Sequence, residues 1–350
     1  MIPAKSFLTV CAVVSASLLA PGYALHAYQA AAKPAAANPI PAAKPSYDPP
    51  PTLARTDLPA WPYPKGVHIE ATPDDGKLYR VPGSAKSFTD TQINRLASGV
   101  DWFPESHPTP PAPVIAGKEG AYRACGECHL MNGAGKPDTA RLQGLPVAYF
   151  LQQLEDMKSD KRHASVVRAS ITTMIPIAKS IDAADARLAA EYFHSLPPFK
   201  NVRVIETDTV PVTHPGPHSV QLVERGATEP IGTRIIEIPE DAERTLLRDP
   251  SSGFIGYVPL GSIKRGEAIA NTGAGKTIAC TTCHGTNLKG MGDQFPGLAG
   301  ASPTAAARQL YDFKSGTRDG KNAAAMKSVV ATLTDQDIVD VTAYLASLQP

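Results

Sequence analysis

The sequence is poor in several kinds of residue, and each shortage excludes a class of protein. Its 350 residues carry a formal net charge of +1, which argues against nucleic-acid binding and against a strongly basic membrane-surface protein. Aromatic residues make up only 6%, so a small domain in this chain needs another large apolar body at its centre. The N-terminal apolar run, Phe7 to Ala20, has 14 residues, fewer than the roughly 20 that span a membrane.

This short run predicts a cleavable export signal over residues 1–24. Lys5 supplies the positive charge in front of it, and Gly22 and Ala24 are the small residues at positions −3 and −1 of a cleavage point. We therefore expect a periplasmic protein, and a membrane anchor formed by the uncleaved signal is the alternative. Cys11 lies inside the run and is expected to be removed with it.

Of the five cysteines, the other four form two copies of one motif, so no pair remains for a structural disulfide. C-x-x-C-H is the attachment motif of c-type haem, in which both thiols bond to the porphyrin and the histidine is the proximal iron ligand. A zinc site or a redox cysteine pair would leave the repeated histidines unexplained. The motifs predict two covalently bound haem c groups, held by Cys125, Cys128, His129, Cys280, Cys283 and His284.

The two motifs belong to an internal repeat. The segment Leu154-Glu-Asp-Met-Lys-Ser matches Leu310-Tyr-Asp-Phe-Lys-Ser, and in each copy a methionine precedes the last helix by the same interval. Each repeat predicts a short helix leading into the motif, a middle helix, a methionine-bearing loop and a terminal helix. The apolar period of 3.6 residues after Pro146 predicts one buried stripe on the first middle helix.

The repeat also nominates the sixth iron ligands, Met174 and Met326. A thioether is a soft, neutral ligand that raises the reduction potential of haem iron, and it fills the position that peroxide chemistry requires to be open. The rival ligands are histidines without a counterpart in the other repeat, namely His163, His194, His214 and His218. Behind the proximal histidines, the carbonyl groups of Pro296 and of Ala140, its match in the first repeat, are expected to accept hydrogen bonds from the imidazoles.

Composition divides the rest of the chain. Residues 25–64 form an Ala/Pro-rich tether expected to lie outside any core. Residues 65–114 are predicted to be an N-terminal extension whose Trp102 and Phe103 pack on the first haem domain. The haem domains are expected at 115–200 and 262–350, joined by a structured connector at 201–261 with short β-like runs.

These residues resemble those of a known family, the dihaem class I c-type cytochromes of the cytochrome c4 type. The resemblance lies in the two haem motifs, in Pro-Gly-Leu-Ala-Gly (296–300), in the segment 309–318, in Met326 and in 333–345. It is looser in the first repeat, and it does not cover the tether or the connector. The resemblance implies a mainly α fold of two class I cytochrome c domains, here joined by a long, partly β connector.

The same resemblance implies an electron carrier rather than an enzyme, working between periplasmic or membrane-bound redox partner proteins. Two alternatives remain: a dihaem peroxidase-like enzyme, and a permanent haem subunit of a dehydrogenase or oxidase complex. For a carrier, we expect docking through a basic cluster in the first domain, which consists of Lys158, Lys161, Arg162 and Arg168. Such clusters of exposed charge steer association with acidic partners.

Overall fold

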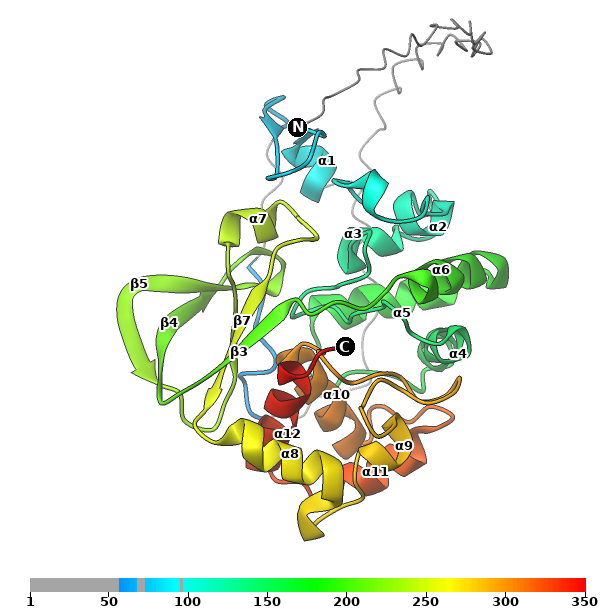
Figure 1. Ribbon diagram of the computed structural model, residues 1–350. Helices are drawn as coiled ribbons and strands as arrows, with labels where there is room; N and C mark the ends of the chain where they lie inside the picture. The colour runs from blue at the N-terminus through cyan, green and yellow to red at the C-terminus, as the bar shows by residue number, and fades with distance from the viewer. Residues whose placement is uncertain (1–56, 68–72, 95–96) are drawn as a thin grey trace, which may run out of the picture. The chain divides into compact units, whose positions relative to one another are not determined.

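Figure 1 shows the computed structural model, which describes residues 57–67, 73–94 and 97–350. The predicted signal and residues 25–56 of the predicted tether lie outside the described residues. Among the residues that are described, no helix combines the length and the apolar character needed to cross a membrane.

The helices of the first repeat follow the predicted order. They are α2 (Ala112–Ile115), α3 (Cys125–His129), α4 (Val147–Lys158), α5 (Ala169–Ser180) and α6 (Ala183–Ser195). The predicted stripe of α4 is confirmed, because Phe150 is buried in one core cluster with Phe193 of α6 and Val147, Leu151 and Leu154 pack against that cluster. The core of this repeat therefore lies between α4 and α6.

The second repeat has the same order with a longer first helix. Its elements are α8 (Ser262–Thr272), η4 (Gly273–Gly275), α9 (Thr281–His284), α10 (Pro303–Lys314), α11 (Ala323–Val330) and α12 (Asp335–Ser347). Helix α8 packs along α12, and the two backbones approach so closely at Gly266 that a β-carbon there would clash with the Asp340 carbonyl oxygen. The counterpart of α8 in the first repeat, α2, has only four residues.

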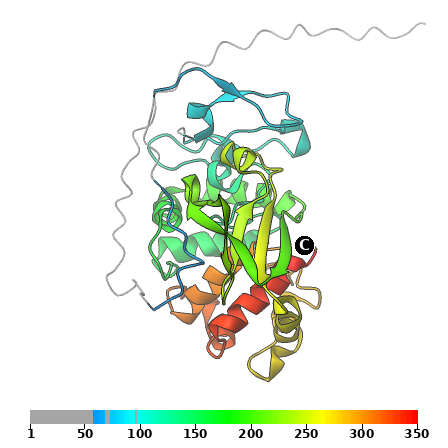
Figure 2. The same ribbon diagram turned by 90° about the vertical axis from the view of Figure 1, so that its left-hand side faces the viewer.

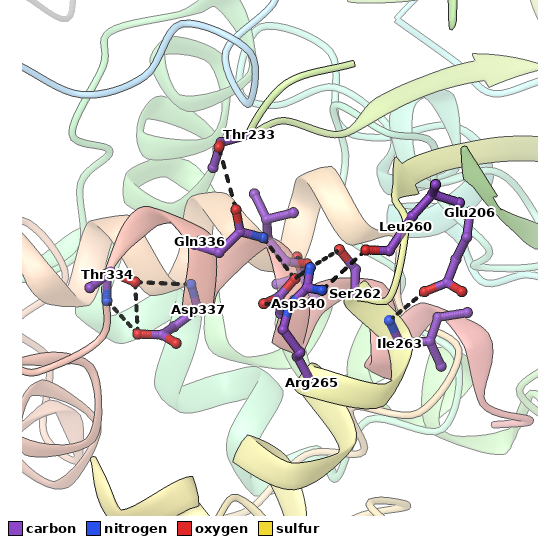
Figure 3. Close-up of polar contacts among 12 residues, drawn as sticks. Glu206, Thr233, Leu260, Ser262, Ile263, Arg265, Thr334, Gln336, Asp337 and Asp340 are labelled. Atoms are coloured by element: carbon purple, nitrogen blue, oxygen red, sulfur yellow. Dashed lines mark hydrogen bonds and ion pairs between the residues drawn. The ribbon is translucent and has the colours of Figure 1, made fainter. Parts of the chain in front are cut away.

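Polar side chains fix the ends of these helices and the α8–α12 contact (Figure 3). Arg265 of α8 binds Asp340 of α12 through both carboxylate oxygens, at 2.7 and 2.8 Å. Thr334 and Asp337 form a capping box at the start of α12. Asp182 accepts from the Asp185 main-chain amide at the start of α6. Such caps satisfy amides that have no partner within the helix.

The connector holds the longer strands of the described chain. Its elements are β3 (Val202–Thr207), β4 (Thr209–Pro215), η3 (Pro217–Ser219), β5 (Gln221–Pro230), β6 (Ile236–Pro239), α7 (Ala242–Leu246) and β7 (Phe254–Pro259). Strand β7 lies in the middle of a three-stranded sheet, parallel to β3 and antiparallel to β6, while β4 and β5 form a hairpin. The sheet packs on α12, which Figure 2 shows beside the strands.

The N-terminal end of the described chain corrects the prediction for residues 25–64. Trp61 and Tyr63 were expected to lie in a tether outside any core, yet Tyr63 is 7% exposed and packs against Tyr311 of α10, with ring centroids 6.4 Å apart. Arg308 of α10 also donates a hydrogen bond to the Pro62 carbonyl group at 2.9 Å. We call residues 57–67 the strap, and it forms part of the core of the second repeat.

The extension before the first motif has short elements of its own. These are β1 (Leu78–Tyr79), β2 (Phe88–Thr89), α1 (Asp90–Asn94) and η2 (Pro104–Ser106). The prediction that Trp102 and Phe103 pack on the first haem domain was wrong, because both lie in a separate cluster with residues of the extension and with Leu247 of the connector. Trp102 contacts Phe88 in an edge-to-face arrangement, and its indole N–H donates to the Leu247 carbonyl group of the connector at 2.8 Å. The extension and the connector therefore share one small core.

Candidate haem-binding site

One large cavity brings the predicted site residues of both repeats together. Its volume is about 1780 Å³, and its lining includes all of the predicted cofactor and iron ligands: Cys125, Cys128, His129, Met174, Cys280, Cys283, His284 and Met326. Pockets for a single drug-sized ligand usually measure about 300–1,000 Å³. The cavity is therefore large enough for two large groups, one beside each motif.

The two proximal histidines have the same environment. The Nδ1–H of His129 donates to the Ala140 carbonyl oxygen at 2.7 Å, and that of His284 donates to the Pro296 carbonyl oxygen at 2.8 Å. Both predicted acceptors are thus confirmed. Burial lowers the pKa of each imidazole, so both rings are neutral near pH 7. A proton held on Nδ1 leaves the Nε2 lone pair of each ring available to a metal.

The motif cysteines lie in apolar surroundings that do not favour thiolates. Burial raises the pKa of Cys125 to about 12 and those of Cys128 and Cys280 to about 11. A reactive redox cysteine needs a lowered pKa instead. Among the described residues, no group of three or more His, Cys, Asp or Glu side chains is arranged to hold a metal ion. The raised pKa values therefore disfavour the thiol-redox alternative.

The two methionines occupy short helices rather than the predicted loops. Met174 lies in α5 and packs near Met157 and Ile175, whereas Met326 lies in α11 and packs against the core of the second repeat. Both side chains line the cavity, and each comes from the helix that follows the middle helix of its repeat. The loop prediction was wrong for both segments. In the second, three consecutive alanines, Ala323–Ala325, precede Met326, and alanine is the strongest helix former. In the first, Ser170–Thr173 consists of weaker helix formers, so local propensity did not indicate helix α5.

The four rival histidines separate into two groups. His163 and His218 line the cavity, whereas His194 and His214 do not. His194 Nδ1 contacts the Leu145 carbonyl oxygen, and His214 is exposed in β4. His218 Nε2 contacts Asn94 Oδ1 at 3.1 Å, and burial lowers the pKa of its imidazole to about 3.

The repeats meet along a junction with approximate twofold symmetry. Arg162 lies five residues after Met157, and Arg318 lies five residues after Phe313, its match in the second repeat. The two arginines form an antiparallel β-bridge. Two main-chain hydrogen bonds flank this bridge at equivalent positions, from His163 to Thr317 at 2.8 Å and from Asp319 to Lys161 at 2.7 Å. Equivalent residues of the two repeats thus contact each other in reciprocal pairs.

Two buried aspartates extend this symmetry. Asp312 of α10 accepts from the Ser165 amide at 2.7 Å and from its hydroxyl group at 2.8 Å. Asp156, the equivalent residue of α4, accepts from the Lys321 amide at 3.3 Å. Each carboxylate therefore binds a main-chain amide of the other repeat. Burial raises the pKa of Asp312.

Arginine side chains line the cavity beside this junction. Arg318 donates to Tyr149, Gln153 and Gln309 at 2.7–2.9 Å, and Arg162 donates to the same two glutamines. Sequence reasoning did not identify this pair as a feature of the site, although their equivalent positions in the repeat were a signal that could have found it.

Several of the arginines that line the cavity are buried, and two of them have N–H donors without a hydrogen-bond partner among the described residues. Burial lowers the pKa of Arg162 and Arg141 to about 10 and that of Arg308 to about 9. Within the described part of the chain, Arg168 Nε and Nη1 and Arg141 Nη1 are buried without a hydrogen-bond partner. Buried cations with open donors are stable only when an anion accompanies them.

This arrangement corrects the predicted docking cluster. Lys158 and Lys161 are exposed, as docking requires. Arg162 and Arg168 instead line the cavity, where Arg162 binds Gln309 of the other repeat and Arg168 binds the Asp138 carbonyl group. The four charges therefore do not form one surface cluster.

The cavity residues fit haem c. Each motif offers two thiols for the porphyrin and an imidazole Nε2 for iron, and a methionine lines the cavity in each repeat. The propionate carboxylates of a haem match the open guanidinium donors, because arginine binds carboxylates through parallel N–H groups. The orphaned donors of Arg168 and Arg141 are thereby accounted for.

Comparison with known proteins agrees with this fit. A family model described as "Cytochrome c" matches residues 263–349. Cytochrome c-554(548) of Halomonas halodenitrificans is 38% identical over 82 residues, which are 23% of this chain and 96% of that protein. Cytochrome c4 of Azotobacter vinelandii is 33% identical over 91 residues, 24% of this chain and 42% of that protein.

A third relative extends over more of the chain. The protein named "Thiosulfate dehydrogenase electron acceptor" of Thiomonas intermedia is 26% identical over 226 residues, 64% of this chain and 78% of that protein. Together with the two haem motifs and the geometry of their histidines, these matches support covalently bound haem c and a role in electron transfer. The chain therefore belongs to the cytochrome c family, as a dihaem class I c-type cytochrome similar to cytochrome c4.

Proposed function

We propose that the protein is an exported electron carrier in which His129 and Met174 ligate one haem iron and His284 and Met326 ligate the other. The observation that carries this proposal is that the four side chains line one cavity at equivalent places of the two repeats. Iron held by His and Met takes up and releases one electron and has a raised reduction potential.

The protein's own groups have distinct roles in this scheme. The carbonyl acceptors of Ala140 and Pro296 fix the orientation of the two imidazoles and make Nε2 more basic. The methionine thioethers fill the sixth coordination position. An iron with six protein and porphyrin ligands has no open position for peroxide, so we propose electron carriage rather than a dihaem peroxidase.

We propose a periplasmic dehydrogenase as the electron donor. The similarity to a protein named as the electron acceptor of thiosulfate dehydrogenase supports this class of partner. We favour a carrier that leaves its partner over a permanent subunit of the partner's complex. Gel filtration of the protein with such a dehydrogenase at micromolar concentration separates the two: a carrier elutes alone, and a permanent subunit co-elutes.

The ligand assignment is tested by substitution of each methionine. We expect Met174→Ala and Met326→Ala each to weaken the near-infrared methionine–iron band of the oxidised protein and to lower the reduction potential of one haem. Met131→Leu is the matched control, because Met131 is a buried packing residue that does not line the cavity, and its change should leave both potentials unaltered. Potentials that stay unchanged in both alanine variants would point to His163 or His218, which also line the cavity.

A further inference from the structure

A buried carboxyl group of the connector lines the haem-binding cavity, and the ligation scheme leaves it unused. Glu237 of β6 is 3% exposed and belongs to the cavity wall. Its Oε2 accepts hydrogen bonds from the hydroxyl groups of Ser302 and Thr304 and from the Thr304 amide, at the start of α10. Its Oε1 is buried and has no hydrogen-bond partner among the described residues. One oxygen of the carboxyl group is thus fixed, and the other is open to a proton.

The cation that acts on Glu237 is Arg308 of α10, and its hydrogen bonds go elsewhere. Its guanidinium group donates to the carbonyl groups of Pro62 in the strap and Pro137 in the first repeat. Three further charged side chains act on Arg308 and face the same part of the cavity: Asp138, Arg168 and Asp312. The two cations and two carboxylates of this group formally balance, so they leave Glu237 without a counter-ion of its own.

The neighbours of Glu237 within the sheet carry no charge. Its partner across the sheet is Gly256 of β7. The residues on either side of it in β6, Ile236 and Ile238, pack in an apolar cluster with Val210 of the hairpin. A carboxylate that is buried without an ion pair is costly, so the neutral acid is favoured. Burial accordingly raises the pKa of Glu237 above that of an exposed glutamate.

We propose that Glu237 is a proton-binding site coupled to electron uptake, so that its carboxylate binds one proton from solvent when an iron in the cavity gains an electron. This inference rests on the proposed electron carriage. The step balances: one electron from the redox partner converts Fe(III) to Fe(II), and one proton forms an O–H bond with the carboxylate of Glu237. The net charge inside the cavity is then unchanged, which a buried site favours. The connector, and neither haem repeat, supplies this group.

The size of the cavity sets the strength of this coupling. Two unit charges about 12 Å apart change each other's binding constant about tenfold at the effective dielectric constant of protein sites. The cavity volume of about 1780 Å³ implies a width of that order. The reduced protein should therefore bind this proton about tenfold more tightly than the oxidised protein. Linkage is reciprocal, so the bound proton raises the reduction potential by the equivalent of tenfold, about 59 mV for one electron.

The test is a spectroelectrochemical titration of the haem-loaded protein at a series of pH values from about 5 to about 9, a range that begins above the ordinary pKa of glutamate. In the wild-type protein, the potential of at least one haem should fall by about 59 mV in total as pH rises. Glu237→Gln imitates the neutral acid. Its potential should equal that of wild type at low pH and stay higher at high pH. A purely structural effect of the substitution would shift the potential equally at every pH.

The matched control is Glu240→Gln, because Glu240 is exposed just after β6 and should leave the wild-type pH profile unchanged. A reduced-minus-oxidised infrared spectrum should show a neutral carboxyl C=O band in wild type and in Glu240→Gln, and should lack it in Glu237→Gln. A pH dependence that persists in Glu237→Gln, or is missing from wild type, would overturn the proposed proton site. A protein whose haems showed no reversible reduction at any pH would instead contradict electron carriage itself.

Discussion

Replacement of Tyr63 by alanine should destabilise the second repeat strongly, although residue 63 lies in a Pro-rich segment far before that repeat, which begins at Ser262. The ring is 7% exposed and contacts Tyr311, in a core cluster that includes Leu345 and Ile338 of α12. Removing a buried aromatic ring from a core costs about 3–5 kcal/mol, the sum of lost burial and the cavity left behind. That is a large part of the roughly 5–15 kcal/mol that stabilises a domain.

The assay is guanidinium unfolding of the haem-loaded protein, followed by the Soret band. With a slope of about 4 kcal/mol per molar guanidinium, a loss of about 4 kcal/mol lowers the unfolding midpoint by about 1 M. Tyr63→Phe retains the ring and should keep most of the stability. Leu78→Ala is the control, because Leu78 is 59% exposed and such surface changes stay within about 0.5 kcal/mol. If the midpoint of Tyr63→Ala equals that of the Leu78 variant, the strap is not part of the core.

Two further predictions concern buried carboxyl groups. Glu237 of β6 is 3% exposed and caps α10 through Thr304, and burial raises its pKa above the ordinary value of 4.5. The folded state therefore binds this proton more tightly than the unfolded chain, so its contribution to stability falls as pH rises through the raised pKa. In urea unfolding at a series of pH values, Glu237→Gln should gain stability relative to wild type as pH increases above about 4.5, whereas Glu240→Gln, at an exposed site, should show no such trend. At the junction, Asp312→Ala should cost about 1–3 kcal/mol because the Ser165 amide loses its acceptor, and Asp312→Asn should cost less; equal losses would mean that the charge, not the acceptor, holds the junction.

The site was more predictable than its surroundings because its chemistry depends on short spacings. In each motif the two cysteines are three residues apart, and the histidine directly follows the second cysteine. The carbonyl acceptors Ala140 and Pro296 follow their histidines within a dozen residues. Local geometry fixes such relations, so the sequence is sufficient to predict them. The apolar stripe of α4 is likewise a property of a single segment, and Phe150 is buried where that pattern places it.

The parts that could not be predicted are contacts between distant segments. Nothing near Tyr63 in the chain indicates that α10 covers it, and composition alone gave a tether. Arg162 has the sequence context of an exposed helix end. In the structure the second repeat packs against this end, so Arg162 binds Gln309 and lines the cavity. The predictions failed where a long-range contact reversed the exposure of a residue, which is the tertiary effect that local patterns do not contain.

The junction between the repeats bears on how this sequence can evolve. Its central hydrogen bonds join main-chain amides and carbonyls, at His163 with Thr317 and at Asp319 with Lys161. Nearly every amino acid offers the same amide, so side chains at these four positions can drift without loosening the contact. Proline at 163 or 319 is the exception, because it has no amide proton to donate. The spacing between the two haem sites is thereby insulated from mutation, while the residues around each site remain free to diverge and to give the two haems different potentials.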